Sequence, residues 1–424
     1  MKILIYGINF SPELTGIGKY TGELAFWLAE HGHEVRVITA PPYYPAWKLD
    51  KSFSNWWTSK LEFGNRKTFN LGLNLGSLLI YRCPLWVPCN PGGVKRLVHL
   101  ASFAIASFPV ILRQIFWRPD LVYVVEPPLF CAPIALVFAW FSNAKAWLHV
   151  QDFEVDAAFN LGMLRGKFLH SLVSWVESKL MHSFDLVSTI SNRMLQRLLD
   201  KGLPLNKTFF APNWVNVSDF SSLAPAARAP YRKQLAISNE SIVALYSGNM
   251  GRKQGLELLG EVAKILLSAS SPIDLVFVFC GDGAGREDLV ACCNGFANVR
   301  FLGLQPKESL PDLLSMADIH LLPQRSGAAD LVMPSKLTGI FASGRPVLVC
   351  ANDGTELAEV VNKRGLVVPP EDVTAFCTAL VMLANNVALR EKFGSAAREY
   401  AFKNLDKNLV LAKIESEMRN LTGC

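Results

Sequence analysis

The residues best suited to chemistry lie in a glycine-rich stretch, 247–255, between an apolar strand-like run (242–246) and a helix-like run (256–267). The stretch holds three glycines, an asparagine and two basic residues: Gly248, Gly251, Gly255, Asn249, Arg252 and Lys253. The glycines let the backbone turn sharply and approach a ligand closely, and the first amides of the following helix would face that ligand. Glycine-rich turns are common between a strand and a helix, but two basic residues in the same turn favour an anionic ligand such as a phosphate.

A second glycine loop follows the first strand-like run and contains Gly16 and Gly18, ahead of a helix-like run at 19–30. A dinucleotide-binding loop is excluded, because the spacing is not GxGxxG and the second strand ends at Ala40-Pro41-Pro42 rather than at an acidic residue. The loop is instead suited to letting a phosphate or a sugar pass close to the backbone.

Carboxylates follow the strand-like run 146–150, where Asp152, Glu154 and Asp156 come after Gln151. Buried acids need a partner or a function. Capping of the next helix is the more common role for Glu154 or Asp156 taken singly, but together the three acids are candidates for catalysis. His320, inside an apolar run, is predicted to be a core histidine.

In the second half of the chain, several candidates follow strand-like runs: Gly281, Gly283, Asp330, Pro334, Ser335, Lys336 and Glu356. Pro334 is predicted at the first helical position, where its missing amide proton costs nothing. Free amides at that helix start could hold a diphosphate, with Lys336 nearby.

These candidates need two α/β domains to position them. Strand-like and helix-like runs alternate through both halves, which indicates two doubly wound parallel sheets with ligands at the carboxyl ends of the strands. We expect an N-terminal domain over 1–217, a linker over 218–240, a C-terminal domain over 241–395 and a terminal helix over 396–424 that is able to pack back on the first domain.

Composition limits the compartment and the partners. Half of the 424 residues are hydrophobic, and residues 1–215 hold 21 Lys and Arg against 14 Asp and Glu, whereas 216–424 hold 21 against 22. A basic N-terminal half suits anionic lipid or a phosphorylated acceptor, and no motif favours nucleic acid. The nine cysteines form no CxxC pair and no signal peptide precedes the first strand, so we expect a cytoplasmic protein.

The run 97–116 is apolar and long enough to cross a bilayer. Pro109, Arg113 and the strand that follows favour a helix that covers one face of the sheet. Peripheral attachment is more credible, since aromatic and lysine side chains, which favour lipid headgroups, gather between residues 43 and 60. Packing of the same aromatics over the core or an acceptor pocket is an equal alternative.

Taken together, these motifs resemble the GT-B glycosyltransferases of family GT4. The resemblance is carried in order by YSGNMGRKQGL, CGDG, ADIHLLP, MPSK and SGRPV, and NFSPELTGIGKY, PPYYP and ISNRM are similar to the branch that makes colanic acid and related exopolysaccharides. It implies retaining, metal-independent transfer from a nucleotide diphosphate sugar, leaning towards GDP-fucose or GDP-mannose, to a polyprenyl-diphosphate-linked glycan on the inner face of the membrane. The C-terminal domain would bind the donor and the N-terminal domain the acceptor.

The resemblance also assigns roles. Arg252 and Lys253 match the basic positions that neutralise the donor diphosphate, with Asp152 and Asp330 as further catalytic candidates. The predicted donor-binding residues are Gly16, Gly18, Gly248, Asn249, Gly251, Gly281, Gly283, Pro334, Ser335, Lys336 and Glu356.

Two positions depart from the family pattern. Gly339 stands where a glutamate usually holds the donor ribose, with Asp330 only near the place of its companion. Gln151 or Asp152 stands where a histidine is common, with His149 displaced, and we favour Asp152. A nucleotide-sugar epimerase of the same architecture and a non-catalytic nucleotide-sugar-binding subunit are the alternative functions.

Overall fold

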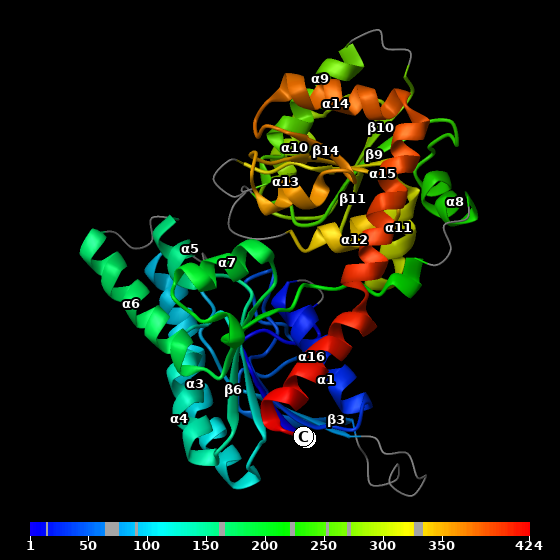
Figure 1. The fold of residues 1–424 in the computed structure, drawn as a ribbon. Coiled ribbons are helices and arrows are strands. Elements are labelled where there is room, and N and C mark those ends of the chain that lie inside the picture. The colour runs from blue at the N-terminus through cyan, green and yellow to red at the C-terminus, as the bar shows by residue number, and fades with distance from the viewer. Residues whose placement is uncertain are drawn as a thin grey trace, which may run out of the picture. The chain divides into compact units, whose positions relative to one another are not determined.

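The computed structural model describes residues 1–13, 16–63, 76–89, 92–160, 166–220, 225–251, 254–268, 273–325 and 334–424. The chain divides into two compact units (Figure 1). Unit 1 comprises Met1–Pro212 with Leu411–Cys424, and unit 2 comprises Asn213–Val410.

Unit 1 is built on an eight-stranded sheet in the order β3-β4-β2-β1-β5-β6-β7-β8. The strands are β1 (Lys2–Tyr6), β2 (Glu34–Thr39), β3 (Thr58–Phe63), β4 (Ser77–Arg82), β5 (Leu121–Glu126), β6 (Lys145–Val150), β7 (Leu186–Thr189) and β8 (Thr208–Phe210). All neighbours pair in parallel except β3, which runs antiparallel to β4 at the edge. β3 was not predicted, because its side chains are exposed and leave no buried face that would create an alternating pattern.

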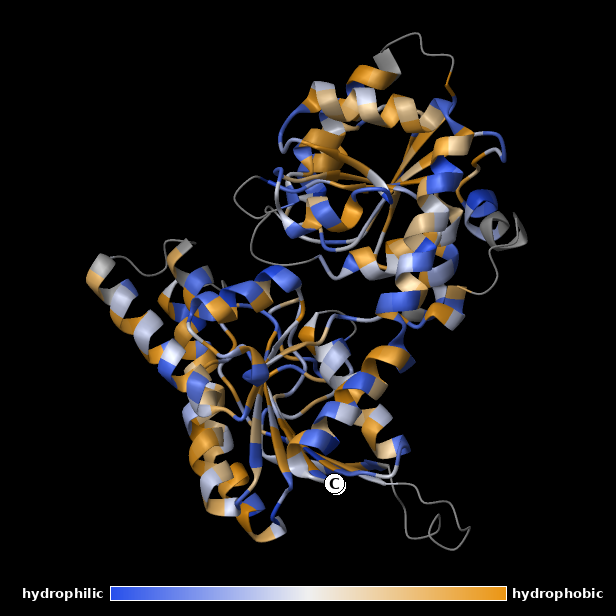
Figure 2. Ribbon diagram, viewed as in Figure 1, coloured by the Kyte–Doolittle hydropathy of each residue, from blue (hydrophilic) through white to orange (hydrophobic). Residues whose placement is uncertain are grey.

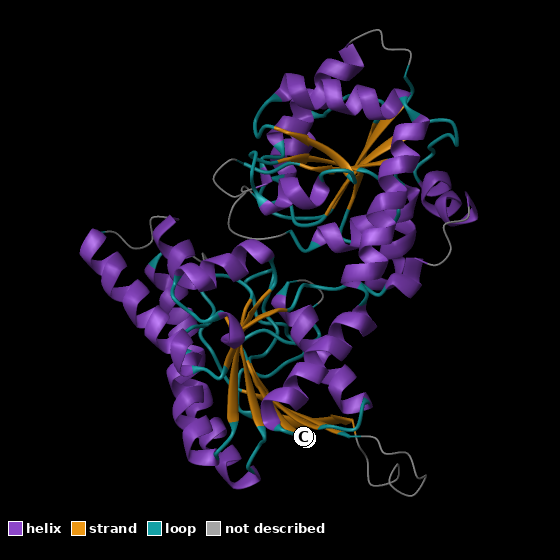
Figure 3. Ribbon diagram, in the orientation of Figure 1, coloured by secondary structure: helices purple, strands orange, loops and turns teal. Residues whose placement is uncertain are grey.

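Helices cover both faces of this sheet. The side that includes α1 (Ile17–Glu30) also receives α16 (Lys407–Thr422), where His33 Nε2 lies 2.8 Å from Glu415 Oε1. The opposite side carries α3 (Val94–Arg113), α4 (Cys131–Ser142) and α6 (Lys167–Ser183), as Figures 1 and 3 show. Right-handed crossovers require this split, since α1 leads towards β2 whereas α3 and α4 lead the other way along the sheet.

Unit 2 holds a six-stranded parallel sheet in the order β11-β10-β9-β12-β13-β14. Its strands are β9 (Ile242–Ser247), β10 (Leu275–Cys280), β11 (Val299–Leu302), β12 (Ile319–Leu322), β13 (Val347–Cys350) and β14 (Gly365–Val368). One core lies under α9 (Glu257–Ser268) and α14 (Val373–Asn385). The other lies under α11 (Leu310–Met316), α12 (Lys336–Ala342) and α15 (Val387–Tyr400).

Part of the predicted linker is the helix α8 (Pro225–Gln234), which packs against α11 within unit 2. Arg232 is buried there and donates to Asp318 Oδ2 at 2.7 Å. A buried ion pair of this kind fixes the segment to the domain that follows it.

Candidate active site

The glycine-rich stretch after β9 is tied to the loop after β10. The amide of Gly248 donates to Cys280 O at 3.0 Å, that of Met250 to Asp282 O at 2.8 Å, and that of Gly285 to Met250 O at 2.8 Å. Because both strands are parallel and adjacent, their carboxyl ends bring Gly248, Asn249, Gly251, Gly281 and Gly283 to one rim of the unit 2 sheet.

Gly281 is a position where this contact allows no side chain. Its φ is 143°, and a Cβ built there would lie 2.0 Å from Gly248 O. The two loops therefore approach each other through bare backbone.

We expect Gly281→Ala to lower the free energy of unfolding of unit 2 by roughly 2–4 kcal/mol, since overpacking adds to backbone strain. Gly295→Ala is the matched control, because Gly295 also has a positive φ, 84°, but nothing within 4 Å of its Cβ position. Urea unfolding of both variants checks the prediction. Equal destabilisation would show that strain alone, rather than the contact with Gly248, requires a glycine.

Lys336 points its amino group at the same loop. Its Nζ lies 3.1 Å from Tyr246 Oη, 4.3 Å from the centre of the Tyr246 ring, and 3.3 Å from the Cβ position of Gly248. Among the described residues no carboxylate pairs with this ammonium. Loss of water around the amine lowers the pKa of Lys336 to about 7. An anion bound beside Lys336 would raise this pKa and favour the charged ammonium.

Tyr246 holds this arrangement together, since its hydroxyl also donates to Asn249 O at 2.6 Å. This tyrosine was predicted only as part of an apolar strand. The signal for its role was its place at the end of a strand that leads into a glycine loop.

The helix α12, which begins at Lys336, starts later than predicted. Pro334 was expected at the first helical position, but α12 starts at Lys336 with Ser335 as N-cap. The carbonyl of Pro334 instead accepts a bond from Leu337 N at 3.0 Å, which closes a turn ahead of the helix. Arg252, Lys253 and Asp330 lie outside the described residues, so their predicted roles rest on the sequence.

Gly339, where the resemblance expects a glutamate, packs closely against α11. A Cβ at Gly339, inside α12, would lie 3.0 Å from Leu314 Cδ1 of α11. The end of the leucine side chain would have to shift slightly to admit a side chain at this position.

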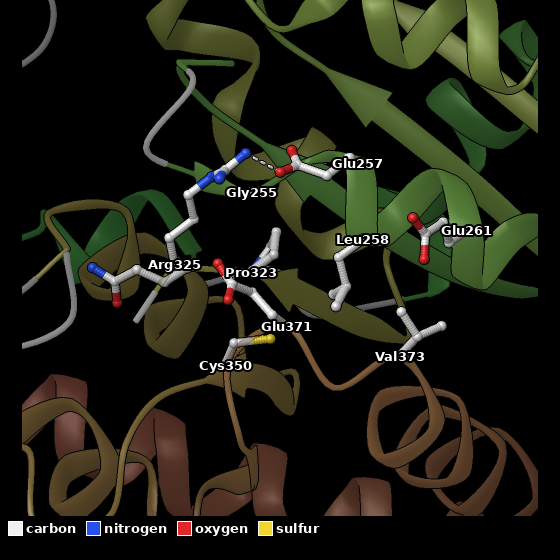
Figure 4. Close-up of a pocket in the computed structure, with 10 residues that line it drawn as sticks. Gly255, Glu257, Leu258, Glu261, Pro323, Arg325, Cys350, Glu371 and Val373 are labelled. Atoms are coloured by element: carbon white, nitrogen blue, oxygen red, sulfur yellow. Dashed lines mark hydrogen bonds and ion pairs between the residues drawn. The ribbon is translucent and has the colours of Figure 1, made fainter. Parts of the chain in front are cut away.

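A hollow opens beside the glycine loop, between the starts of α9 and α14 and the ends of β12 and β13 (Figure 4). Arg325, directly after β12, forms an ion pair with Glu257 at the start of α9. Glu261 and Glu371 also line the hollow. Arg325 was not predicted as a site residue, although it follows a strand end, the place where the other candidates were sought. The carboxylates can accept hydrogen bonds from hydroxyl groups such as those of a sugar.

Glu356 is the first residue of α13 (Glu356–Val361), whose N-cap Thr355 accepts a bond from Ala358 N at 3.2 Å. It follows the turn after β13 and is half-buried.

In unit 1, the predicted glycine loop is organised by an acid that the sequence analysis did not assign. Glu13 is buried and accepts bonds from the amides of Tyr43 and Tyr44, both at 3.1 Å. Burial raises the pKa of Glu13. A Cβ at Gly18 would lie 2.5 Å from Glu13 Oε2, whereas Gly16 precedes α1 with a φ of 64°. Gly18 therefore makes room for Glu13, and its predicted contact with the donor stays a prediction.

The three carboxylates after β6 have different surroundings in the structure. Glu154 accepts a bond from Leu129 N at 2.7 Å, and burial raises its pKa to about 6. Asp156 pairs with Lys201 at 3.5 Å. Asp152 stays half-buried in the bend directly after β6, at the carboxyl edge of the unit 1 sheet. Protein groups thus engage Glu154 and Asp156, but neither of these contacts is the helix cap that was expected for each singly.

Glu126, at the end of β5, was not singled out either. It is buried, and neither carboxylate oxygen has a hydrogen-bond partner within the described residues. Burial, followed by the charges of Glu177 and Glu154, raises its pKa well above the usual value. This carboxyl group lies opposite Val150, the last residue of β6, close in the chain to Asp152.

Both histidines near the candidates are buried. His149 Nδ1 lies 2.8 Å from Ser188 Oγ and its Nε2 lies 2.9 Å from Gln151 Nε2, and burial lowers the pKa of His149 to about 3. His320 contacts Ser343 Oγ at 3.2 Å, and burial lowers its pKa to about 3 as well. His320 is a core histidine, as predicted. Across the described residues no cluster of three or more His, Cys, Asp or Glu could hold a metal ion.

Known proteins share both units. Residues 15–214 match the glycosyl transferase 4-like domain, and residues 241–386 match the glycosyl transferases group 1. The chain is 42% identical over 425 residues to WcaI of Escherichia coli (strain K12), described as a colanic acid biosynthesis glycosyl transferase, which covers 99% of this chain and 100% of that protein.

Solved structures confirm the predicted fold. A sucrose-phosphate synthase from Thermosynechococcus elongatus superposes with a TM-score of 0.75 at 17% identity, covering 100% of this chain and 99% of its own. Alr3699/HepE of Anabaena, solved with UDP and glucose, gives a TM-score of 0.67 at 15% identity, covering 99% and 100%. The chain therefore belongs to the GT-B glycosyltransferases with a glycosyl transferase 4-like domain and a group 1 domain, in the branch of the colanic acid protein WcaI.

Proposed function

We propose that this glycosyltransferase moves a sugar, with retention, from a nucleotide diphosphate sugar to a polyprenyl-diphosphate-linked glycan during colanic acid-type exopolysaccharide synthesis. The name of the relative WcaI supports the pathway. The leaning towards GDP-fucose or GDP-mannose rests on the same resemblance.

The observation that carries the donor assignment is Lys336. A half-buried amine with no carboxylate partner among the described residues, beside a loop of three glycines, is suited to an incoming diphosphate. The negatively charged phosphates would pair with the amine and stabilise its protonated form. Arg252 and Lys253, four and five residues after Gly248, would add further positive charge.

In this proposal the three cations stabilise the leaving nucleoside diphosphate as negative charge builds on it in the transition state. They would do so without a metal ion. Asp330 is proposed near the donor sugar, and the carboxylates of the hollow next to Arg325 would accept hydrogen bonds from donor hydroxyls. These carboxylates would supply hydrogen-bond acceptors for the hydroxyl groups of the donor, although Gly339 stands in place of the usual glutamate.

For the acceptor half, we propose that Asp152 acts at the carboxyl edge of the unit 1 sheet. Its half-buried place in the bend directly after β6, at the carboxyl ends of the strands, supports this role. A lipid-linked acceptor would be reached from the cytoplasmic side, by a protein held peripherally on the membrane.

The test is a transfer assay. Purified protein is incubated with a panel of GDP- and UDP-sugars and short lipid-diphosphate-linked glycans, and the masses of the products are measured by mass spectrometry. We expect one donor to add one sugar mass to a lipid-linked acceptor, with the anomeric configuration of the donor retained, as read by NMR. Inversion would contradict the retaining mechanism, and transfer to water-soluble glycans alone would contradict the acceptor assignment.

The same assay addresses the two alternatives. An epimerase would change the donor without any acceptor, and a binding subunit would hold a donor without turnover. The relative WcaI is described as a glycosyl transferase, which supports neither alternative.

A further inference from the structure

One side of unit 1 carries an apolar surface that faces water. We define the apolar face as the outer sides of α3, the short helix η1 (Gln114–Trp117) that continues it, α4 and α6. Within it α3 packs on α4, and α4 packs on α6. Figure 2 shows that hydrophobic residues make up much of α3 and α4.

On α3 and η1, apolar residues lie on the solvent-facing side, which is polar in an ordinary surface helix. Exposed apolar residues recur every three, four or seven positions, at Val94, Val98, Ile105, Phe108, Leu112 and Phe116. That spacing places them along one stripe of a helix. Ile105 is 74% exposed and Phe116 is 92% exposed. Such a stripe normally faces a core, yet here the opposite stripe already does.

The inner stripe of α3 is bound to the sheet. Phe103 and Ile111 are fully buried, and Ser107 Oγ lies 2.6 Å from Tyr6 Oη of β1. The stretch Val94–Trp117 is long and apolar enough to cross a membrane. The apolar inner side of α3 belongs to the core of unit 1. The packing of unit 1 does not account for the apolar outer side.

Large exposed side chains extend the apolar face beyond α3. On α4 and α6 they are Val137, Trp140, Phe141, Phe168, Leu172, Trp175 and Val176. Next to α3, the exposed Trp57 donates from Nε1 to Ala106 O at 2.9 Å. Of the aromatics predicted for membrane contact, Tyr43 is instead buried in the core, whereas Trp56 and Trp57 stay exposed.

The charges on the face are of one sign. Lys95, Arg113 and Lys179 are exposed on its helices. The single acid in the four helices is Glu177, which is buried and bonded to Lys201 at 2.5 Å. A partner must therefore be apolar and, at its edge, anionic.

We infer that the apolar face docks on a lipid bilayer that contains anionic phospholipids. Tryptophan and phenylalanine insert among headgroups and acyl chains, while lysine and arginine bind phosphates at the same depth. A second copy of the chain fits less well, because a twofold contact through this face would set its cations against one another. The inference deepens the proposed function and rests on it for its purpose, since a lipid-linked acceptor lies in that bilayer.

The experiment is sedimentation of the full-length protein with vesicles. One set is phosphatidylcholine alone and the other contains phosphatidylglycerol as well. We expect binding that is stronger to the anionic vesicles and weaker at high salt. The triple variant Ile105→Ser, Phe108→Ser, Phe116→Ser should lose at least about tenfold in affinity for both vesicles.

Matched controls separate the face from general hydrophobicity. Ile265→Ser, Met382→Ser and Val387→Ser together remove three exposed apolar residues of unit 2 and should leave vesicle binding unchanged. Lys95→Gln, Arg113→Gln and Lys179→Gln together should remove the preference for anionic lipid but keep weak binding to neutral vesicles.

The outcomes are distinct. Equal vesicle binding by the wild type and the apolar-face triple variant would overturn the inference, as would a wild type that ignores vesicles but forms a dimer that the triple variant cannot. Nucleotide-sugar binding, measured by calorimetry without lipid, should be the same in all these variants. Loss of vesicle binding with donor binding intact supports the docking face, whereas failure of donor binding in the wild type counts against the proposed function alone.

Discussion

Replacing Lys336 with methionine is expected to lower kcat/KM for the nucleotide sugar by about 100-fold or more, the usual size of effect when a charge-stabilising group is removed. The reason is the position of its Nζ, 3.1 Å from Tyr246 Oη and beside Gly248. Methionine keeps the length and the apolar stem but removes the charge. Steady-state kinetics and calorimetric titration of the donor measure the change.

Lys336→Arg is the control, because arginine keeps a charge that does not titrate in the working range. The pKa of about 7 also gives the wild type a pH signature. Below pH 7 the amine is already protonated and donor affinity should be constant. Above pH 7 binding must take up a proton, so the dissociation constant should rise by up to about tenfold per pH unit until the pKa of the bound state is reached.

A flat pH profile in both variants, with a sloping one in the wild type, assigns the titration to Lys336. The same slope in Lys336→Met would place it on another group and contradict the assignment. A nucleotide sugar is the proper probe, since its diphosphate diester does not itself titrate in this range.

The double variant Arg252→Ala, Lys253→Ala is expected to abolish detectable transfer. Two cations in one turn that neutralise a leaving diphosphate would together supply several kcal/mol of transition-state stabilisation, which corresponds to about 1000-fold or more in rate. The mass-increment assay measures the loss, and calorimetry shows how much of it is donor binding.

Lys264→Ala is a suitable comparison, since it removes a cation from α9, the helix that follows the loop, without changing the loop itself. It should keep near wild-type transfer. Undiminished turnover in the double variant would remove Arg252 and Lys253 from the mechanism and leave Lys336 as the remaining candidate for the diphosphate.

Much of the fold could be predicted because each central strand is a short apolar run followed by a polar or glycine turn. Parallel strands buried on both faces leave that signal regardless of their neighbours. The edge strand β3 was missed for the complementary reason, since an exposed strand needs no apolar pattern. The helix α8 was taken for a linker because its burial depends on α11 and on the Arg232–Asp318 pair, which are distant in the sequence.

The candidate site was predictable in place but not in detail. Strand ends in a parallel sheet meet at one rim, so Gly248, Gly281 and Lys336 could be expected near each other. The role of Glu13 could not, because its contact with Gly18 depends on how the loop folds back. The position of Tyr246 between Lys336 and the Asn249 carbonyl likewise requires the strand and the later helix to meet.

The amino-acid sequence alone determined the order of the buried strands, the two-domain α/β class and the resemblance to glycosyltransferases, because those depend on local periodicity and on short motifs. Only the tertiary structure decided which polar groups lack a partner and which apolar groups lack a cover. Burial depends on segments that are far apart in the chain. The lowered pKa of Lys336 and the exposed stripe of α3 both arise in this way, from what the folded neighbours do or do not place against them.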